Sequence, residues 1–406
     1  MWIISNQYWE SNNFFLNTQF ETNLELMNIK AKNISKSFEG KVVLENLDLE
    51  VESDSFCSIL GPTGVGKTTL LRILAGIEKP DSGNVFYDGV NMMNVPVQKR
   101  PNAFVYQQFV NYPSMTIYDN IASPLRVSQK ILSKTEIDER VQKTAQLLGI
   151  HEVLHHLPEE VSGGQQQRCA IARAMAKDAK YFFLDEPLSN LDYKLREELR
   201  SELKHIFHER EGIVVSATQE PIDALTMATH VGFLHEHRIL QYGEVRDVYE
   251  NPSNLEVGSW FSYPKMNIIP CEVIKHNGTT QLKINDELNI DIGSQITKLN
   301  RDRYLLGIRA HHLSISRENE SWIPIRVMIE FAEVVGSDTE LHLKYENEQL
   351  IMLMQQVGPF SVGNEITIYI DPSQFYIFDA LTGEFVAKSK ARRTNDKEEK
   401  NNKMIS

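Results

Sequence analysis

Residues 61–69 read GPTGVGKTT and stand between an apolar run at 56–60 and a helical pattern at 70–75. This stretch fits G-x-x-x-x-G-K-[ST], the sequence of a loop that wraps around phosphate groups. Its glycines let the backbone curl so that N–H groups point inward, and the helix that follows adds partial positive charge. Lys67 can reach the β- and γ-phosphates, and Thr68 offers a hydroxyl to Mg²⁺. We therefore predict a nucleotide-binding α/β fold. The candidate nucleotide-binding residues of the loop are Gly61, Pro62, Thr63, Gly64, Val65, Gly66, Lys67, Thr68 and Thr69.

Two adjacent acids follow a second apolar run, at residues 181–184. Asp185 ends this predicted strand and is suitably placed for the ligand shell of a magnesium ion. Glu186 projects differently and is the natural residue to orient and deprotonate an attacking water. Two acids after a strand can also be plain surface charge, but the phosphate-binding loop upstream favours the catalytic interpretation.

The order of the predicted elements indicates two domains. Between about residues 27 and 243, short β-rich runs alternate with helical patterns, which is typical of a mainly parallel sheet covered by helices. After about residue 262, short strands separated by turns favour a small antiparallel barrel of OB-like size. The predicted units are an extension or upstream mis-start at 1–26, a nucleotide-binding domain at 27–245 with a helical part at about 110–177, an OB-like accessory domain at 262–386, and a disordered charged tail at 387–406.

Charge and cysteine content exclude several classes of function. The formal net charge is -13, whereas nucleic-acid-binding proteins are usually basic, so we expect no nucleic-acid partner. The basic cluster at 388–393 is interpreted as part of a solvated tail rather than as a lipid or nucleic-acid patch. Cys57, Cys169 and Cys271 lie far apart, which argues against a zinc site or a disulfide framework. No apolar run approaches the ~18 residues of a membrane span, so work at a membrane would require a partner.

A third motif makes the pattern specific. Residues 161–165 read VSGGQ and precede Asp185 by one predicted helix. In combination with the two motifs above, this segment strongly resembles the ATP-binding subunits of ABC transporters, whose signature begins (L)SGGQ; Val161 replaces the leucine. The resemblance implies a P-loop NTPase fold with a RecA-like core, an antiparallel β subdomain and a helical subdomain. It also implies that Ser162, Gly163, Gly164 and Gln165 grasp the γ-phosphate of ATP bound to a partner subunit.

Further matches follow from the same resemblance. Phe38 stands where the family stacks an aromatic ring on adenine, and Gln107 matches the glutamine of the magnesium and water shell. Asp192 matches the acid of a loop that crosses the dimer interface. The implied metal residues are Thr68, Gln107 and Asp185, and the implied ligands are ATP and Mg²⁺. The implied partners are two membrane permeases, a second ATPase subunit or a second copy, and indirectly a periplasmic solute-binding protein, at the cytoplasmic side of the inner membrane.

The C-terminal part narrows the resemblance to importers of the maltose and glycerol-phosphate type. Residues 263–267, 306–309 and 335–339 look like their accessory barrel, although Ala310-His311-His312 replaces the usual Pro-Glu-His and weakens any inference of regulator binding. Residues 106–113 and 217–221 look like a branch linked to uptake of glycerol and related polyols. The alternative is a weakly active or regulatory ATP-binding protein that does not itself drive transport.

Gln219, in the stretch SATQEP at 216–221, is the main departure from the family. Most members have a histidine there that contacts the γ-phosphate. A glutamine amide can donate a hydrogen bond to phosphate, but it cannot gain a proton as an imidazole can. Either Gln219 keeps the geometry while Glu186 sustains hydrolysis, or this chain is the weaker half of an unequal pair. The presence of Glu186, Asp185 and Lys67 favours retained activity within a heterodimer, with Glu186 and Gln219 as the catalytic residues.

Overall fold

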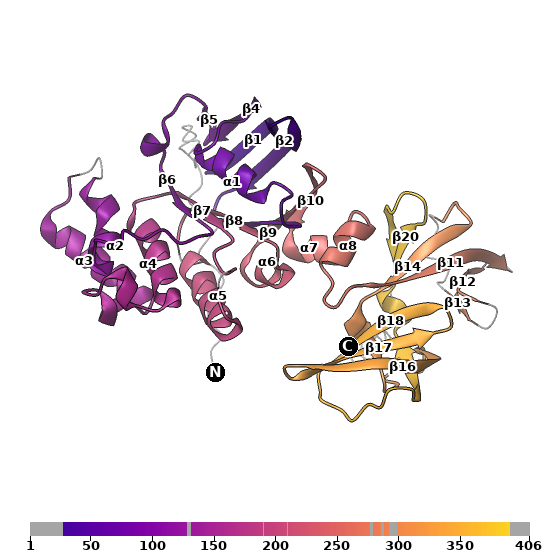
Figure 1. Ribbon diagram of the computed structural model, residues 1–406. Coiled ribbons are helices and arrows are strands. Elements are labelled where there is room, and N and C mark those ends of the chain that lie inside the picture. Colours follow the sequence, from indigo (N-terminus) through magenta and orange to yellow (C-terminus); the bar gives the residue numbers. More distant parts are fainter. Residues whose placement is uncertain are drawn as a thin grey trace, which may run out of the picture.

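The computed structural model describes residues 27–127, 131–189, 191–208, 210–276, 279–285, 288–291 and 299–389. Two layered regions are arranged side by side, and two helices join them (Figure 1). The predicted extension at 1–26 and residues 390–406 of the predicted tail lie outside the described residues.

A six-stranded sheet with the order β10-β9-β3-β8-β7-β6 forms the centre of the first region. Its strands are β3 (Phe56–Leu60), β6 (Asn102–Val105), β7 (Tyr181–Asp185), β8 (Ile213–Thr218), β9 (His230–His235) and β10 (Arg238–Glu244). All pairs are parallel except the edge pair β9–β10. Every residue of β3, β7 and β8 is buried, as expected for parallel strands covered on both faces. Their carboxyl ends meet at one edge of the sheet, where ligands of such folds bind.

A second, antiparallel sheet covers one face of this centre. Its order is β2-β1-β4-β5, from β1 (Asn28–Phe38), β2 (Lys41–Glu52), β4 (Ser82–Tyr87) and β5 (Val90–Asn91). Helix α1 (Lys67–Ala75) lies between the two sheets, because its Leu70 and Leu74 share one buried cluster with Ile29 of β1 and Val215 of β8.

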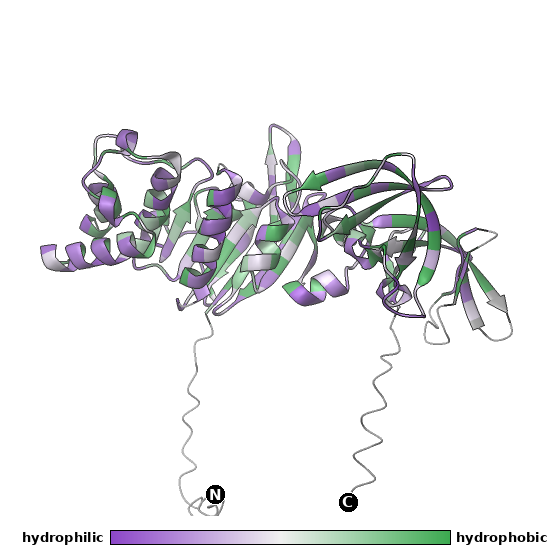
Figure 2. Ribbon diagram, turned by 90° about the horizontal axis from the view of Figure 1, so that it is seen from below, coloured by the Kyte–Doolittle hydropathy of each residue, from purple (hydrophilic) through white to green (hydrophobic). Residues whose placement is uncertain are grey.

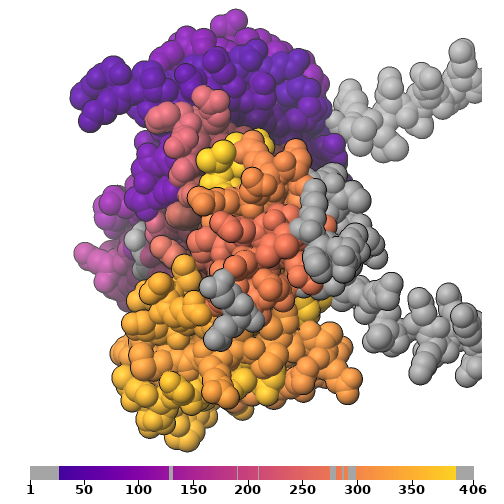
Figure 3. Space-filling view, turned by 90° about the vertical axis from the view of Figure 1, so that its right-hand side faces the viewer, coloured from indigo at the N-terminus to yellow at the C-terminus, as the bar shows by residue number. Residues whose placement is uncertain are grey.

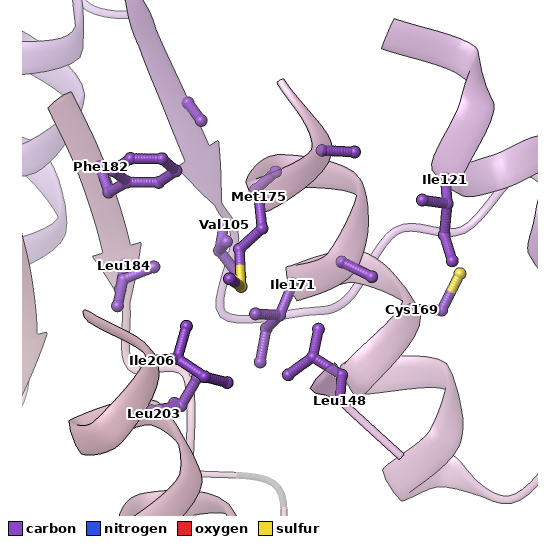
Figure 4. Close-up of a cluster of buried hydrophobic side chains, with 14 of the residues drawn as sticks. Val105, Ile121, Leu148, Cys169, Ile171, Met175, Phe182, Leu184, Leu203 and Ile206 are labelled. Carbon is purple, nitrogen blue, oxygen red and sulfur yellow. The ribbon is translucent and has the colours of Figure 1, made fainter. Parts of the chain in front are cut away.

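Helices cover the opposite face. They are α2 (Ile117–Arg126), α3 (Lys134–Leu147), α4 (Gly163–Ala176), α5 (Tyr193–His208) and α6 (Pro221–Met227). Figure 4 shows how Ile171 of α4 reaches Leu203 and Ile206 of α5 beside Leu184 of β7. Burying one such side chain stabilises the fold by roughly 1.5–3 kcal/mol, so this cluster fixes α4 and α5 against the strand that carries the acids.

The second region is all-β and contains two antiparallel sheets around one core. The first sheet has β11 (Asn267–His276), β12 (Thr279–Lys283), β13 (Asn289–Asp291), β14 (Arg303–Ile308), β20 (Tyr376–Asp379) and β21 (Phe385–Lys388). The second has β15 (Leu313–Ser314), β16 (Ile323–Val335), β17 (Asp338–Tyr345), β18 (Glu348–Met354) and β19 (Glu365–Ile370). Buried apolar residues from both sheets form this core, and Figure 2 shows many hydrophobic residues along these strands and many hydrophilic ones along the helices of the first region.

The two regions meet through α7 (Val245–Glu250) and α8 (Leu255–Trp260). Arg309 of the second region is fully buried and donates hydrogen bonds of 2.7 Å to the carbonyls of both Tyr249 and Phe261. Its guanidinium also lies 3.7 Å from the centre of the Tyr249 ring, a cation–π contact. In the space-filling view the orange and yellow residues of the second region lie in front of the indigo and magenta residues of the first (Figure 3). Short 3₁₀ turns complete the chain at Val97–Lys99, His151–Val153, Pro158–Glu160, Ala310–His312 and Pro372–Gln374.

Candidate active site

The loop after β3 is curled tightly enough to require glycine at two positions. A Cβ atom at Gly61 would lie 2.2 Å from the carbonyl oxygen of Leu234, which is backbone and cannot move aside. Gly66 has φ 113°, in the left-handed region, and a Cβ there would lie 3.0 Å from the carbonyl oxygen of Val43. The loop is therefore packed between Leu234 of β9 and Val43 of β2.

The side chain of Lys67 packs against the backbone of this loop. Its ammonium donates 2.8 Å hydrogen bonds to the carbonyl oxygens of Gly61 and of Pro62, and the residue is only 4% exposed. Burial lowers the pKa of Lys67, and the Glu186 carboxylate, 3.6 Å away, opposes that shift. A buried cation in this position is matched to a multiply charged phosphate chain.

Thr68 and Asp185 form the second part of the site. The Thr68 hydroxyl, at the start of α1, donates a 2.8 Å hydrogen bond to Oδ1 of Asp185, at the end of β7. Burial raises the pKa of Asp185, against the lowering effect of the Thr68 hydrogen bond. A hydroxyl beside a carboxylate is the oxygen donor set that Mg²⁺ uses together with phosphate oxygens and waters, so these residues fit that ion. In the described part of the chain, no group of three or more His, Cys, Asp or Glu side chains forms a complete metal site by itself.

Glu186 has an unusual backbone. Its φ is 45°, in the left-handed region that a residue with a Cβ seldom adopts. A 3.0 Å hydrogen bond from the N–H of Glu186 to the carbonyl of Ala217 in β8 stabilises this conformation. The turn aims the carboxylate back over the sheet edge, where Oε2 accepts a 2.8 Å hydrogen bond from Nε2 of Gln107. The two acids that are adjacent in sequence thus face different partners.

Gln219 lies at the corner between β8 and α6. Its side-chain Oε1 accepts a 2.5 Å hydrogen bond from the hydroxyl of Thr63, a residue of the phosphate loop. Since the amide oxygen is used in this bond, the NH₂ group is the part left to donate to a ligand. A cavity of about 30 Å³ next to it is lined in part by Glu186, Ser189 and Arg196.

Phe38 ends β1 and is 44% exposed, so its ring is accessible at the hairpin that packs on the phosphate loop. The Lys36 ammonium lies 4.9 Å from the centre of this ring. The hydrogen bonds and the ion pair described above join Lys67, Glu186 and Gln107, and they separately join Thr68 with Asp185 and Thr63 with Gln219. Phe38, the segment 162–165 and Asp192 lie on other elements.

Comparison with known proteins agrees with this geometry. A family profile of ABC transporters matches residues 44–189, and a TOBE-domain profile matches residues 306–378. An sn-glycerol-3-phosphate import ATP-binding protein of Salmonella typhimurium is 32% identical over 88% of this chain and 99% of its own length. An ABC transporter ATP-binding protein of Sinorhizobium fredii is 32% identical over 89% of this chain and 95% of its own length.

The chain belongs to the ABC transporter ATP-binding proteins.

This ABC protein is also similar to a sugar-import subunit and to a cassette of known structure. A trehalose/maltose import ATP-binding protein of Thermococcus litoralis is 31% identical over 88% of this chain and 99% of its own. A dimeric bacterial ABC transporter cassette of known structure matches 54% of this chain and 99% of its own, with 30% identity and a TM-score of 0.50. The predicted fold class, a P-loop NTPase followed by an OB-like all-β domain, is confirmed, and so is the predicted enzyme class, an ATPase coupled to transport. None of the helices in the described ranges has the length and apolar character that a membrane span requires.

The signature segment of this ABC cassette begins α4. Ser162 caps the helix in a reciprocal box with Gln165, which donates its N–H to the Ser162 hydroxyl at 3.3 Å and accepts the Ser162 N–H at 3.0 Å. A Cβ on Gly164 would lie 2.3 Å from Leu195 of α5, whereas a Cβ on Gly163 would meet nothing within 4 Å. A side chain at position 164 would therefore require Leu195 to shift, while the space beside Gly163, at the N-terminus of the helix, is open.

Asp192 occupies the start of α5, where its Oδ1 accepts a 3.0 Å hydrogen bond from the N–H of Leu195. The first turn of α5, which follows the predicted interface loop, therefore lies against the signature helix through Leu195 and Gly164. Sequence reasoning missed two connections around Gln219: its bond to Thr63, and the bond of Asp223 to Arg200. These residues are far apart in the chain, and no motif joins them.

Proposed function

We propose that this chain is the ATP-binding and ATP-hydrolysing subunit of an ABC importer that takes up a carbohydrate or a polyol such as glycerol or glycerol phosphate. The observation that carries this proposal is that one edge of the central sheet collects the groups that phosphoryl transfer requires, linked by short polar contacts. These groups are Lys67, Thr68, Gln107, Asp185 and Glu186. The sugar and glycerol-phosphate relatives support the importer class.

The bound nucleotide would use three parts of this chain. The exposed Phe38 ring offers a face on which adenine can stack. Backbone N–H groups of the phosphate loop and the Lys67 ammonium receive the phosphates, which replace the two carbonyls that Lys67 now contacts. Thr68, Asp185 and Gln107 would hold magnesium through side-chain oxygens, and the ion would supply positive charge to the phosphates.

Hydrolysis then needs a base beside the γ-phosphate. Glu186 takes the proton of the attacking water while the new oxygen–phosphorus bond forms and the bond to the leaving ADP breaks. Gln107 holds the Glu186 carboxylate at 2.8 Å, and Lys67 keeps positive charge 3.6 Å from it. As charge spreads over the γ-phosphoryl oxygens, Lys67 and the Gln219 NH₂ group face it as donors.

The second half of each site comes from a partner subunit. Ser162, Gly163, Gly164 and Gln165 would donate to the γ-phosphate bound on the partner, and Asp192 would lie in the interface between the two subunits. The open N-terminus of α4 at Gly163 supports this assignment. We propose a second ABC ATPase subunit as that partner, together with two permeases at the cytoplasmic face of the inner membrane and a periplasmic solute-binding protein.

Because Gln219 carries no charge, the side chain that would contact the γ-phosphate at this corner is neutral. Thr63 already orients the amide oxygen, so the NH₂ group can donate without a proton being gained or lost. We therefore propose that this subunit retains activity, and we expect Gln219→His to keep the turnover number within about fivefold at pH 7. A fall larger than tenfold in that variant would contradict the proposed role of the amide.

The experiment that tests the function is affinity purification of the tagged chain from membranes, followed by reconstitution in vesicles. We expect two permeases and a second ATPase subunit to copurify, and ATP hydrolysis to rise when the solute-binding protein and glycerol or glycerol phosphate are added. Recovery of the chain without integral membrane proteins would refute the transport proposal and favour the regulatory alternative.

A further inference from the structure

The corner that carries Gln219 is held in shape by a small polar network. The Thr218 hydroxyl accepts a 3.0 Å hydrogen bond from the N–H of Glu220 and donates one of 3.1 Å to Oδ2 of Asp223, in α6. Gln219 stands between Thr218 and Glu220, whose side-chain hydroxyl and backbone N–H this network joins. Its position therefore depends on where Asp223 is held.

Asp223 is held by an arginine from another element. Arg200, two turns into α5, directs Nε and Nη2 at Oδ1 of Asp223, at 2.8 and 2.7 Å. The side chains of both residues are buried, at 4% and 6% exposed. A charge pair of this kind adds little net stability compared with apolar residues, but it fixes a single geometry because neither partner tolerates the loss of the other.

The predicted interface loop, which ends at Asp192, directly precedes α5. The carbonyl of Asp192 accepts a 2.9 Å hydrogen bond from the N–H of Arg196, and Nη2 of Arg196 returns to the carbonyl of Leu191 at 3.1 Å. A continuous chain of contacts thus runs from the loop through α5 to Arg200, then to Asp223 and the corner. Apolar packing of Leu199 and Leu203 holds the helix as one rigid body.

We propose that Arg200 is a positioning residue for the γ-phosphate contact: it fastens the corner of Gln219 to the helix that begins at the subunit-interface loop. A shift of that loop when the partner docks then moves the Gln219 amide relative to Thr63 and the phosphate. The inference rests on the proposed role of Gln219. Arg200 is buried and its guanidinium bonds to Asp223 and Glu197, so we expect its effect on turnover to pass through Asp223 and the corner that carries Gln219.

The test is a double-mutant cycle in the full-length chain assembled with its transporter. Arg200→Gln combined with Asp223→Asn replaces the ion pair by two amides that can still bond, which avoids an unpaired buried charge. We expect this pair variant to lower kcat about tenfold and to leave KM for ATP within about twofold, because the phosphate loop is untouched. In a Gln219→Ala background, which by itself lowers kcat about tenfold or more, the pair variant should have no further effect.

Two further variants separate positioning from loss of stability. Arg200→Lys keeps the charge but loses the forked geometry, and it should show the same non-additivity with a smaller effect on kcat. Arg301→Gln with Asp379→Asn removes another arginine–aspartate pair, 2.9 Å apart but with the arginine side chain 43% exposed, in the accessory domain and should leave kcat unchanged. Melting temperatures are recorded for all variants.

The outcomes distinguish the two proposals. If Gln219→Ala leaves kcat unchanged, the proposed role of Gln219 fails, and the role of Arg200 fails with it. If Gln219→Ala slows turnover but the effects of the two changes multiply, Arg200 is merely structural, and the inference is overturned while Gln219 keeps its role. An unchanged kcat in the pair variant overturns the inference as well.

Discussion

Glu186→Gln should nearly abolish turnover while leaving the fold intact. The substitution removes the proton acceptor, and assistance by a general base contributes about 10²–10⁴-fold to rate, or about 3–5 kcal/mol. The new amide keeps an oxygen that can accept the hydrogen bond that Gln107 now donates at 2.8 Å. Lys67 loses a carboxylate at 3.6 Å but keeps two carbonyl acceptors at 2.8 Å. We therefore expect the free energy of unfolding to change by about 1 kcal/mol or less.

The assay is steady-state phosphate release by the assembled transporter, with ATP affinity and the melting temperature measured on the same preparation. ATP should bind at least as tightly as to the unaltered protein. Glu250→Gln is the matched control, since it also breaks an ion pair of a glutamate, to Arg246 at 2.9 Å on α7, far from the sheet edge. Turnover of the Glu186→Gln transporter within about twofold of the control would refute the assignment of Glu186 as the base.

Three further predictions follow from burial and packing. Asp185→Asn should abolish magnesium-dependent hydrolysis yet raise the melting temperature of the nucleotide-free chain at pH 7, because burial raises the pKa of this carboxyl and makes its ionised form costly. This increase in melting temperature should become smaller as the pH falls towards about 4, the ordinary pKa of an aspartic acid. A melting temperature at pH 7 below that of the unaltered chain would contradict the prediction. Gly61→Ala should destabilise the chain by about 1–3 kcal/mol, since its Cβ would lie 2.2 Å from a carbonyl, whereas Gly163→Ala, with nothing within 4 Å, should not lower the melting temperature. Burial lowers the pKa of His312 to about 3. The protein should therefore lose stability as the pH falls from about 6.5 towards 3, because the unfolded chain binds a proton at His312 that the folded chain does not bind. Urea titrations should show that the free energy of unfolding falls less between pH 7 and pH 5 for His312→Phe than for the unaltered protein. Equal falls would contradict this.

Much of the core was predictable because its signals are local. The runs at 56–60, 181–184 and 213–215 are continuous and apolar, as parallel strands buried on both faces must be, and all three are strands. The helix predicted between the signature segment and Asp185 begins at Gly163, because Ser162 caps it. Strand β21 runs to Lys388, into the segment assigned to the tail.

The connections that organise the site were not predictable from one sequence. The bond from Thr63 to Gln219 spans 156 residues and depends on β3 and β8 being neighbours. Arg200 looks like an ordinary solvated charge on an amphipathic helix, and only the packing of α5 turns it inward to Asp223. Arg309 likewise gives no sign in the sequence that it will be buried between two tyrosine rings. The roles assigned to individual residues from motifs remain predictions.

The most direct test is a structure of the Glu186→Gln transporter with ATP and magnesium bound. We predict Nε2 of Gln219 within about 3.2 Å of a γ-phosphate oxygen, Oε1 still bonded to Thr63, and Ser162 of the partner subunit on the opposite side of the same phosphate. A Gln219 side chain turned away from the phosphate, with the γ-phosphate contacted by neither chain at this corner, would contradict the account.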